Sequence, residues 1–382
     1  MEYPVVTILG PRQSGKTTLV RMNFPKKPYF SLEDPDIRAA ALQDPRGLLA
    51  QSPEGAILDE IQRAPELLSY IQGLVDRSPR QCQFILTGSH QPALHQAISQ
   101  SLAGRTALLT LLPFSLNELR HYRGSWDPFE LAILGAFPRV HQEKLKPDRF
   151  YNGYLQTYVE RDVRAMVNVK DLRRFQQFLV LLAGRVGQVV NYMSLSNDLG
   201  VSSTTIKHWM IVLAASFVVF ELPPYFANLT KRVIKSPKVY FTDTGLAAHL
   251  VGIHTKDQAL RDPLRGFLYE NLIVTEILKI RLNHGLRPGI FFYRDTHGNE
   301  VDLLVQEDRI LTPIEIKSAA TFTGDFSTGI HRFQAALKTP CRSGVILYNG
   351  KQPLQFHGIR VLNPLSESGL AHLTAIAKGE ES

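Results

Sequence analysis

The chain has few cysteines: Cys82 and Cys341 are the two in its 382 residues, and they lie far apart. Neither belongs to a CxxC pair or to a cysteine–histidine spacing that is typical of a zinc site. A disulfide framework is therefore not expected, and this usage favours a reducing compartment. We expect a cytoplasmic protein.

Long hydrophobic runs are also missing. The longest apolar stretch covers residues 211–226, and Glu221, Pro223 and Pro224 interrupt it, so it is too short to span a bilayer. Residues 1–10 have no basic segment before their apolar residues and no small-residue cleavage site, so they do not predict a signal peptide. We expect no membrane partner.

Acidic residues are fewer than basic ones, 35 against 43, which gives a net charge of +8 and a pI of about 9.4. Such a balance suits a polyanionic partner, nucleic acid first, although many basic proteins bind none. The apolar share of 44% and the charged share of 20% are ordinary for a globular protein. The length favours two or three domains.

Short apolar runs alternate with helical spacing in the first 145 residues. This alternation predicts an α/β domain whose parallel sheet carries helices on both faces. Residues 146–262 are expected to be mostly helical, and residues 263–382 to form a smaller α/β domain. The strands expected in the first domain are residues 5–9, 29–32, 56–58, 84–87 and 106–112, with helices at 65–77 and 92–102.

Residues 10–17 match the pattern GxxxxGK[ST] directly after an expected strand and before an expected helix. Glycines allow a tight turn whose N–H groups point at phosphate oxygens, and the helix N-terminus adds positive potential. We expect Lys16 to reach the terminal phosphates of ATP and Thr17 to bind Mg²⁺. The residues assigned to the nucleotide are Gly10, Pro11, Arg12, Gln13, Ser14, Gly15, Lys16, Thr17 and Thr18.

An apolar strand at residues 56–58 ends in Asp59 and Glu60. Asp59 is suited to hold magnesium through water, and Glu60 to polarise the attacking water. The alternative is an acidic helix cap after a strand, and the phosphate loop upstream makes that alternative the weaker one.

Two further residues are candidates at the same site. Ser89, with Thr87 next, follows the strand at residues 84–87 and could contact the γ-phosphate or the water, unless it serves only the turn. Arg105 could act as an arginine finger, from its own chain or from a neighbouring subunit. Its alternative role is that of a cap at a helix C-terminus.

The strings GPRQSGKTTL, ILDEIQ, ILTGS, SLAGR and LLPFS together resemble the AAA-type P-loop ATPases that carry an AAA_14 module followed by a DUF4143 domain. The resemblance covers nearly the whole chain, and it implies ATP and Mg²⁺ as cofactors and makes a homo-oligomer plausible. That family usually has a short helical segment before its first strand. This chain starts almost at the strand, so a less complete adenine side is expected.

Residues 195–213 fit a helix-turn-helix, with residues 202–213 as the candidate recognition helix and Lys207, His208 and Trp209 on it. Strands at residues 217–222 and 239–242 and a basic loop at 230–238 complete a winged-helix pattern with a cationic wing. Lysines there would contact DNA phosphates, with an affinity that falls as salt rises. The alternative is a module used only for packing or as an ATPase lid.

A second group of chemical residues lies near the C-terminus. Glu270 is on an expected helix, Asp302 on the strand at residues 300–305, and Glu315 and Lys317 on one face of the strand at 313–317. Three acids and a lysine can hold Mg²⁺ and support phosphodiester cleavage. The strings GNEVDLLV and IEIKS resemble the PD-(D/E)XK nuclease superfamily. Glu300 shares a face with Asp302, and a degenerate nuclease fold that only binds is the alternative.

These features predict an ATPase that couples ATP turnover to DNA binding or processing, with DNA as its partner. Its metal ligands would be Thr17 and Asp59 in the first domain and Glu270, Asp302 and Glu315 in the last. One rival is a nucleotide-gated regulatory switch that does not cut. Another is a translocating or branch-migrating motor whose nuclease-like domain only clamps DNA.

Overall fold

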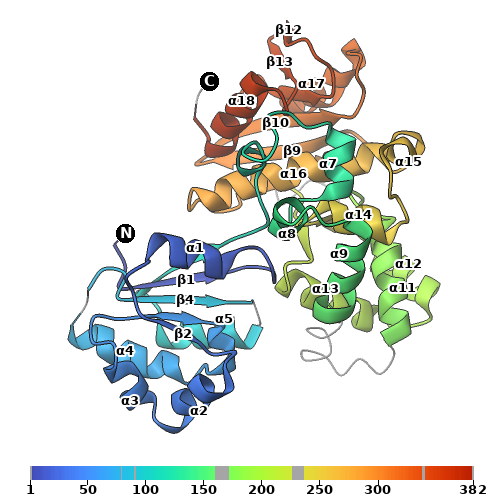
Figure 1. Ribbon diagram of the computed structural model, residues 1–382. Coiled ribbons are helices and arrows are strands. Elements are labelled where there is room, and N and C mark those ends of the chain that lie inside the picture. The colour runs from blue at the N-terminus through green and yellow to red at the C-terminus, as the bar shows by residue number, and fades with distance from the viewer. Residues whose placement is uncertain are drawn as a thin grey trace. The chain divides into compact units, whose positions relative to one another are not determined.

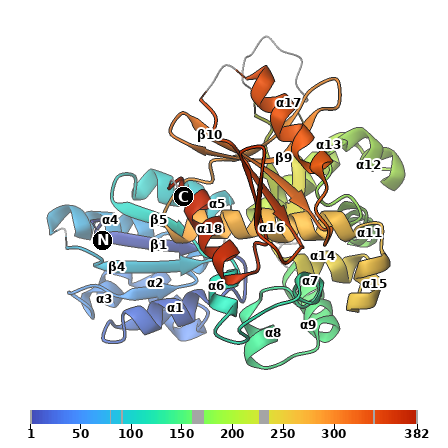
Figure 2. The ribbon, with the colours of Figure 1, turned by 90° about the horizontal axis from the view of Figure 1, so that it is seen from above.

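The computed structural model describes residues 2–78, 80–89, 92–159, 172–225, 236–337 and 340–380 (Figures 1 and 2). The chain divides into two compact units. The first contains Met1–Pro113 and Ala215–Phe217, and the second contains Phe114–Ala214 and Val218–Ser382. The division after Pro113 does not coincide with the domain boundary expected at residue 145, because residues 114–145 belong to the second unit.

The first unit contains a five-stranded sheet in the order β2-β3-β4-β1-β5, and every strand pair in it is parallel. The predicted parallel α/β domain is therefore confirmed. The strands are β1 (Val5–Leu9), β2 (Tyr29–Ser31), β3 (Ile57–Asp59), β4 (Phe84–Gly88) and β5 (Thr106–Thr110). The helices are α1 (Lys16–Asn23), α2 (Pro35–Gln43), α3 (Pro45–Ala50), α4 (Leu67–Arg77) and α5 (Pro92–Ser101), with a 3₁₀ turn η1 (Ile61–Arg63).

Alternate residues of β1 pack into two different apolar layers. Val5 and Leu9 join the layer beneath α2 to α5, whereas Val6 and Ile8 join the layer that holds Val20 of α1. Figure 1 shows α1 on one side of this sheet and α2, α3 and α4 on the other. A strand that is apolar at every position is typical of a sheet covered on both faces.

The second unit begins with short helices and continues into a helix-turn-helix. Gly200 ends α12 with a φ of 62°, a left-handed conformation that glycine adopts without strain. β6 (Val219–Leu222) pairs antiparallel with β7 (Lys238–Phe241). Residues 230–235 of the predicted basic wing lie outside the described residues. The helices are α6 (Leu116–Leu119), α7 (Pro128–Leu134), α8 (Pro138–Gln142), α9 (Pro147–Tyr154), the π-helical turn η2 (Leu155–Val159), α11 (Leu172–Ala183), α12 (Tyr192–Leu199) and α13 (Ser203–Ala215).

A six-stranded mixed sheet forms the C-terminal part of the second unit, in the order β12-β13-β11-β10-β9-β8 (Figure 2). Its strands are β8 (Ile290–Arg294), β9 (Glu300–Glu307), β10 (Ile310–Lys317), β11 (Val345–Tyr348), β12 (Leu354–Phe356) and β13 (Ile359–Leu362). The helices are α14 (Thr244–Leu250), α15 (Lys256–Arg261), α16 (Arg265–Asn283), α17 (Thr328–Ala336) and α18 (Glu367–Lys378), with a 3₁₀ turn η3 (Gly324–Ser327).

Helix α16 is the central element of this unit. Its residues from Leu268 to Arg281 are all buried, and it contacts α7, α14, β7, β10 and α18. Burial on all sides explains why a helix of this length carries few exposed polar positions. In the part of the chain that the structure describes, no helix combines the length and apolar composition that crossing a membrane requires.

Candidate functional site

The phosphate loop connects β1 to α1. Gly15 has a φ of 94°, and a Cβ on Gly10 would lie 2.1 Å from the carbonyl oxygen of Leu111, so both glycines are required by the backbone. The side chain of Ser14 is buried, and its Oγ makes no hydrogen bond with any described residue. A buried hydroxyl without a partner in such a loop fits a ligand that supplies oxygen acceptors, as phosphates do.

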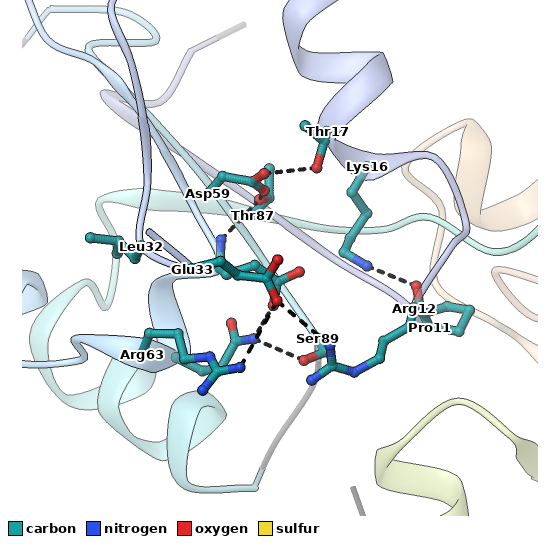
Figure 3. A network of polar contacts seen from close by, with 12 residues as sticks. Pro11, Arg12, Lys16, Thr17, Leu32, Glu33, Asp59, Arg63, Thr87 and Ser89 are labelled. Atoms are coloured by element: carbon teal, nitrogen blue, oxygen red, sulfur yellow. Dashed lines mark hydrogen bonds and ion pairs between the residues drawn. The ribbon is translucent and has the colours of Figure 1, made fainter. Parts of the chain in front are cut away.

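Lys16 lies at the first position of α1 and is 5% exposed. Its Nζ donates hydrogen bonds to the carbonyl oxygen of Gly10 at 3.1 Å and to that of Pro11 at 2.7 Å (Figure 3). Its ammonium group therefore lies within the loop that the sequence assigns to the nucleotide, where it can neutralise phosphate charge.

Asp59, at the end of β3, accepts hydrogen bonds from three hydroxyl groups. Tyr29 Oη lies 2.6 Å from Oδ2. Thr17 Oγ1 lies 2.8 Å from the same oxygen, and Thr87 Oγ1 donates to Oδ1 (Figure 3). The two expected magnesium ligands, Thr17 and Asp59, are thus in direct contact. Burial, and then the hydrogen bond to Asp59, raises the pKa of Tyr29 above its ordinary value, so the phenol stays protonated as a donor.

Glu60 follows Asp59 in a left-handed conformation, with a φ of 59°. This conformation is uncommon for a residue with a side chain and occurs mostly where the surroundings impose it. Gln62 Nε2 donates to Glu60 Oε2 and, at 2.9 Å, to Ser89 Oγ. The amide therefore connects the expected base with the polar residue that follows β4.

Sequence reasoning did not single out Tyr29 or Gln62. Gln62 stands within the string ILDEIQ, two residues after Glu60. This position in the sequence is the pattern by which it could have been predicted as a site residue. Tyr29 begins β2, and the parallel pairing of β2 with β3, with Tyr29 opposite Ile57 and Ser31 opposite Asp59, brings it to this site. No local pattern indicates that contact.

A second charged group lies beside the loop. Oε1 of Glu33 is 3.9 Å from Arg12 Nη1 and 3.9 Å from Arg63 Nη2 (Figure 3). Two guanidinium groups are therefore gathered near the phosphate loop, and sequence reasoning had assigned only Arg12 to it.

The expectation that Arg105 acts as an arginine finger within its own chain is wrong. Arg105 directly precedes β5, and β5 runs parallel to β1 with Thr106 opposite Val5. It lies at the amino end of the sheet, whereas the phosphate loop follows the carboxyl end. Its guanidinium pairs with Asp76, with Nε 2.5 Å from Oδ1 and Nη2 2.9 Å from Oδ2. A contact with the nucleotide of a neighbouring subunit stays a prediction.

The predicted C-terminal residues lie on three elements of the second unit. Lys317 Nζ is 2.5 Å from Glu315 Oε1 and 3.3 Å from Asp302 Oδ2, and the latter oxygen also accepts from the backbone N–H of Ile316 at 2.8 Å. Antiparallel pairing of β9 and β10 brings Asp302 and Glu315 together. Burial, and then repulsion from Asp302, raises the pKa of Glu315 to about 8.

Glu270 of α16 is held by residues of β7 that sequence reasoning had not assigned to the cluster. Its Oε1 accepts from Tyr240 Oη at 2.6 Å and from Lys238 Nζ at 3.0 Å, and Lys238 also lies 2.7 Å from Glu300. Burial lowers the pKa of Lys238, but the carboxylates around it, Glu270 foremost, raise it further, so the ammonium keeps its charge.

The acids of this cluster only partly fit a divalent cation. Oε2 of Glu315 is buried and makes no hydrogen bond with any described residue, which suits a metal ligand. Yet Glu270, Asp302 and Glu315 do not bring three carboxylate oxygens within 4.8 Å of one another, among the residues that the structure describes. The ammonium groups of Lys238 and Lys317 lie against these acids instead.

The helix-turn-helix presents some of the predicted residues and buries others. Lys207 and His208 are exposed on α13. Trp209 is 5% exposed and packs against Phe175 and Phe178 of α11. Trp209 therefore belongs to the core. Of the three predicted residues, Lys207 and His208 are the ones exposed to a partner.

Family models match three consecutive parts of the chain: an AAA domain over residues 2–120, a domain of unknown function (DUF8612) over 126–257, and another (DUF4143) over 265–367. The uncharacterized proteins Mb2031c of Mycobacterium bovis and Rv2008c of Mycobacterium tuberculosis are each 32% identical over 323 residues, which is 83% of this chain and 71% of theirs. An uncharacterized protein of Haemophilus influenzae is 25% identical over 238 residues, 58% of this chain and 57% of that protein.

Two solved structures are also similar. A Walker-type ATPase of Pyrococcus abyssi has a TM-score of 0.40 and 18% identity, over 65% of this chain and 91% of that one. The ORC2 protein of Aeropyrum pernix in its ADP form has a TM-score of 0.30 and 14% identity, over 57% of this chain and 80% of that one. Neither TM-score indicates a shared overall fold.

Proposed function

The chain belongs to the same family as Mb2031c and Rv2008c, and it contains an AAA domain and a DUF4143 domain. We propose that its first unit hydrolyses ATP with magnesium. The observation that carries this proposal is the 2.8 Å hydrogen bond between Thr17 Oγ1 and Asp59 Oδ2. It places the hydroxyl after the loop lysine beside the acid of β3, as a magnesium site requires.

Each residue has a distinct task in this proposal. Amide groups of residues 13–17 and the ammonium of Lys16 bind the phosphates. Thr17 and Asp59 hold Mg²⁺, which neutralises charge on the phosphates. Glu60 accepts a proton from the attacking water, and Gln62 and Ser89 keep that carboxylate oriented.

The test measures ATP binding and hydrolysis separately. Lys16→Ala is expected to abolish hydrolysis because the terminal phosphates lose their cation. Glu60→Gln is expected to keep ATP binding and to slow hydrolysis by about 10²-fold or more. Lys26→Ala is the matched control, because Lys26 is an exposed lysine in the loop between α1 and β2. This variant should hydrolyse ATP at the rate of the parent. Normal turnover by Lys16→Ala would overturn the assignment.

We further propose that ATP turnover is coupled to DNA binding or processing by the second unit. The net charge of +8, the helix-turn-helix of α12 and α13 and the exposed Lys207 and His208 support this.

Fluorescence anisotropy with labelled duplex DNA at rising salt is the test of this DNA-binding proposal. Binding should weaken steeply with salt, and Lys207→Ala should reduce both the affinity and the salt dependence. Salt-independent or absent binding would contradict the proposal.

We include in this proposal a nuclease activity at the acid cluster, which rests on the buried Glu315 Oε2 that makes no hydrogen bond with any described residue. Asp302 and Glu315 would hold Mg²⁺, which stabilises charge on a scissile phosphate, and Lys317 would position the water. The assay incubates linear and branched DNA with Mg²⁺ or Mn²⁺, with and without ATP. Cleavage that disappears in Asp302→Ala and survives in Lys16→Ala without ATP would assign the cut to this cluster.

A second candidate function is favoured by Lys238. Its ammonium pairs with both Glu270 and Glu300, so the protein itself balances part of the negative charge of the cluster. The second unit would then bind DNA without cutting, as a regulatory switch or as the clamp of a branch-migrating motor. Absence of cleavage on every substrate, together with ATP-dependent strand displacement that survives Glu315→Ala, would favour the motor.

A further inference from the structure

Asp148, His249 and His254 lie together in the second unit, and none of them is among the residues assigned to nucleotide or nuclease chemistry. Asp148 is in the first turn of α9, His249 is in the last turn of α14, and His254 follows five residues after His249, before α15. Each offers one ligand atom, and these three atoms all lie within 4.8 Å of one another. All three residues fall within the stretch matched by the domain of unknown function DUF8612.

The two imidazoles point the same ring nitrogen at the same carboxylate oxygen. Nδ1 of His254 is 2.6 Å and Nδ1 of His249 is 3.5 Å from Oδ1 of Asp148. The Nδ1 of His249 is buried and makes no hydrogen bond of good geometry with any described residue. Two ring nitrogens that converge on one oxygen, one of them without a hydrogen bond, form a donor set that a cation can complete.

We propose that Asp148, His249 and His254 form a binding site for a divalent transition-metal ion of the Zn²⁺ class. Imidazole nitrogen and carboxylate oxygen are preferred ligands of Zn²⁺ and its neighbours, whereas Mg²⁺ and Ca²⁺ prefer oxygen alone. Bonds of about 2.0–2.2 Å place neighbouring ligand atoms about 3.0–3.5 Å apart, so only small side-chain shifts separate the observed distances from coordination. Three protein ligands leave a further position for water.

The backbone around the two histidines is already fixed. The turn between them closes through hydrogen bonds from Gly252 N to His249 O and from Ile253 N to Ala248 O, at 3.1 and 2.9 Å. The backbone N–H of His254 donates to Gln258 Oε1 at 2.8 Å. His249 also packs against the ring of Tyr151, one turn after Asp148 on α9. A site built on a fixed turn needs little ordering when the ion binds.

A bound ion would fasten α9 to the turn between α14 and α15. Asp148 and His254 are 54% and 38% exposed at their side chains, whereas His249 is 11% exposed, so the ion would be reached from solvent on one side. This arrangement, with ligands from two elements and one buried histidine, suits an ion that stabilises the junction of these helices.

The test is titration of the full chain with Co²⁺ or Zn²⁺, monitored by calorimetry and by the visible absorption of bound Co²⁺. The titration is done in an Asp302→Ala background with millimolar Mg²⁺ and without ATP, so that carboxylate and hydroxyl sites do not contribute. We expect one equivalent of Co²⁺ to bind and to raise the melting temperature. Because no ATP is present, the result does not depend on the proposed ATPase activity.

The decisive variants are Asp148→Asn and His254→Ala, since both side chains are partly exposed and neither substitution should prevent folding. Each is expected to weaken Co²⁺ binding by about tenfold or more and to remove the thermal shift. His331→Ala, at an exposed histidine of α17, is the matched control and should bind Co²⁺ as the parent does. Equal binding by parent and His254→Ala, or no binding by the parent, would show an ion pair only and overturn the proposal.

Discussion

Nζ of Lys238 lies 3.0 Å from Oε1 of Glu270, and the lysine side chain is 3% exposed. Lys238 is the last residue of the basic wing predicted at 230–238 and the first residue of β7. The prediction that it contacts DNA phosphates is wrong, because its side chain is buried and its charge pairs with acids inside the second unit. A lysine in this place has two consequences: it holds α16 to β7, and it neutralises an acid that was predicted to bind metal.

Removing that lysine should destabilise the protein strongly. Lys238→Met leaves Glu270 buried without its counter-charge, and losing one partner of a buried pair costs about 3–5 kcal/mol. We expect the second unit to unfold at a lower urea concentration, as measured by circular dichroism. Lys256→Met, which removes an exposed partner of Asp127, should have a much smaller effect. The double variant Lys238→Met, Glu270→Gln should recover part of the loss, and a double variant less stable than the single one would contradict this account.

Gln62 should influence the rate of hydrolysis more than the affinity for ATP. Gln62→Ala removes the amide that joins Glu60 to Ser89, so the Glu60 carboxylate loses its fixed orientation. We expect kcat to fall about tenfold with little change in KM. Gln43→Ala, at an exposed glutamine at the end of α2, is the control. A change confined to KM would place Gln62 in nucleotide binding instead.

Glu276 should make stability depend on pH. Its carboxylate accepts from the backbone N–H of Leu116 at 3.0 Å, but burial raises its pKa from the ordinary 4.5 to about 7, an effect that Lys279 only partly opposes. The folded chain therefore binds more protons than the unfolded chain between these values, and the free energy of unfolding falls as pH rises through this window.

The shift corresponds to about 3 kcal/mol for this group. Glu276→Gln cannot ionise, so the stability of the parent relative to the variant should drop by about that amount from about pH 5 to about pH 8. Urea unfolding of both proteins at the two pH values is the measurement. A parent that gains stability relative to the variant over this range would show that Glu276 is ionised in the folded chain.

Gly135 should not tolerate a side chain. Its φ is 69°, and a Cβ would lie 1.9 Å from Tyr151 Oη and 2.4 Å from Asp243 Oδ1. Asp243 caps α14 and also accepts from the backbone of Ala136, so Gly135→Ala would disturb the contact between α7, α9 and α14. We expect a loss of about 3 kcal/mol or more, read as a lower melting temperature.

Gly153, within α9, is the matched control for that substitution. A Cβ there meets nothing within 4 Å, and alanine favours a helix over glycine by about 1 kcal/mol. Gly153→Ala should therefore keep or raise the melting temperature. An equal change in melting temperature for the two substitutions would show that the close contacts at Gly135 do not determine the loss of stability.

The sequence by itself determined the strand, loop and helix of the phosphate site and the acid-bearing strands of both units. These features depend on residues close together in the chain: Gly15 sets the turn before Lys16, and alternation along β10 puts Glu315 and Lys317 on one face. The parallel sheet followed from the same local pattern. The winged-helix and nuclease assignments stay predictions.

Only the tertiary structure decided which distant residues join these local sites. Strand order brings Tyr29 to Asp59 and leaves Arg105 at the opposite end of the sheet, and the packing of β7 on α16 delivers Lys238 to Glu270. Asp148 meets two histidines because α9 packs on α14. Such contacts depend on how buried faces pack over the whole chain, and no short stretch of sequence contains that information.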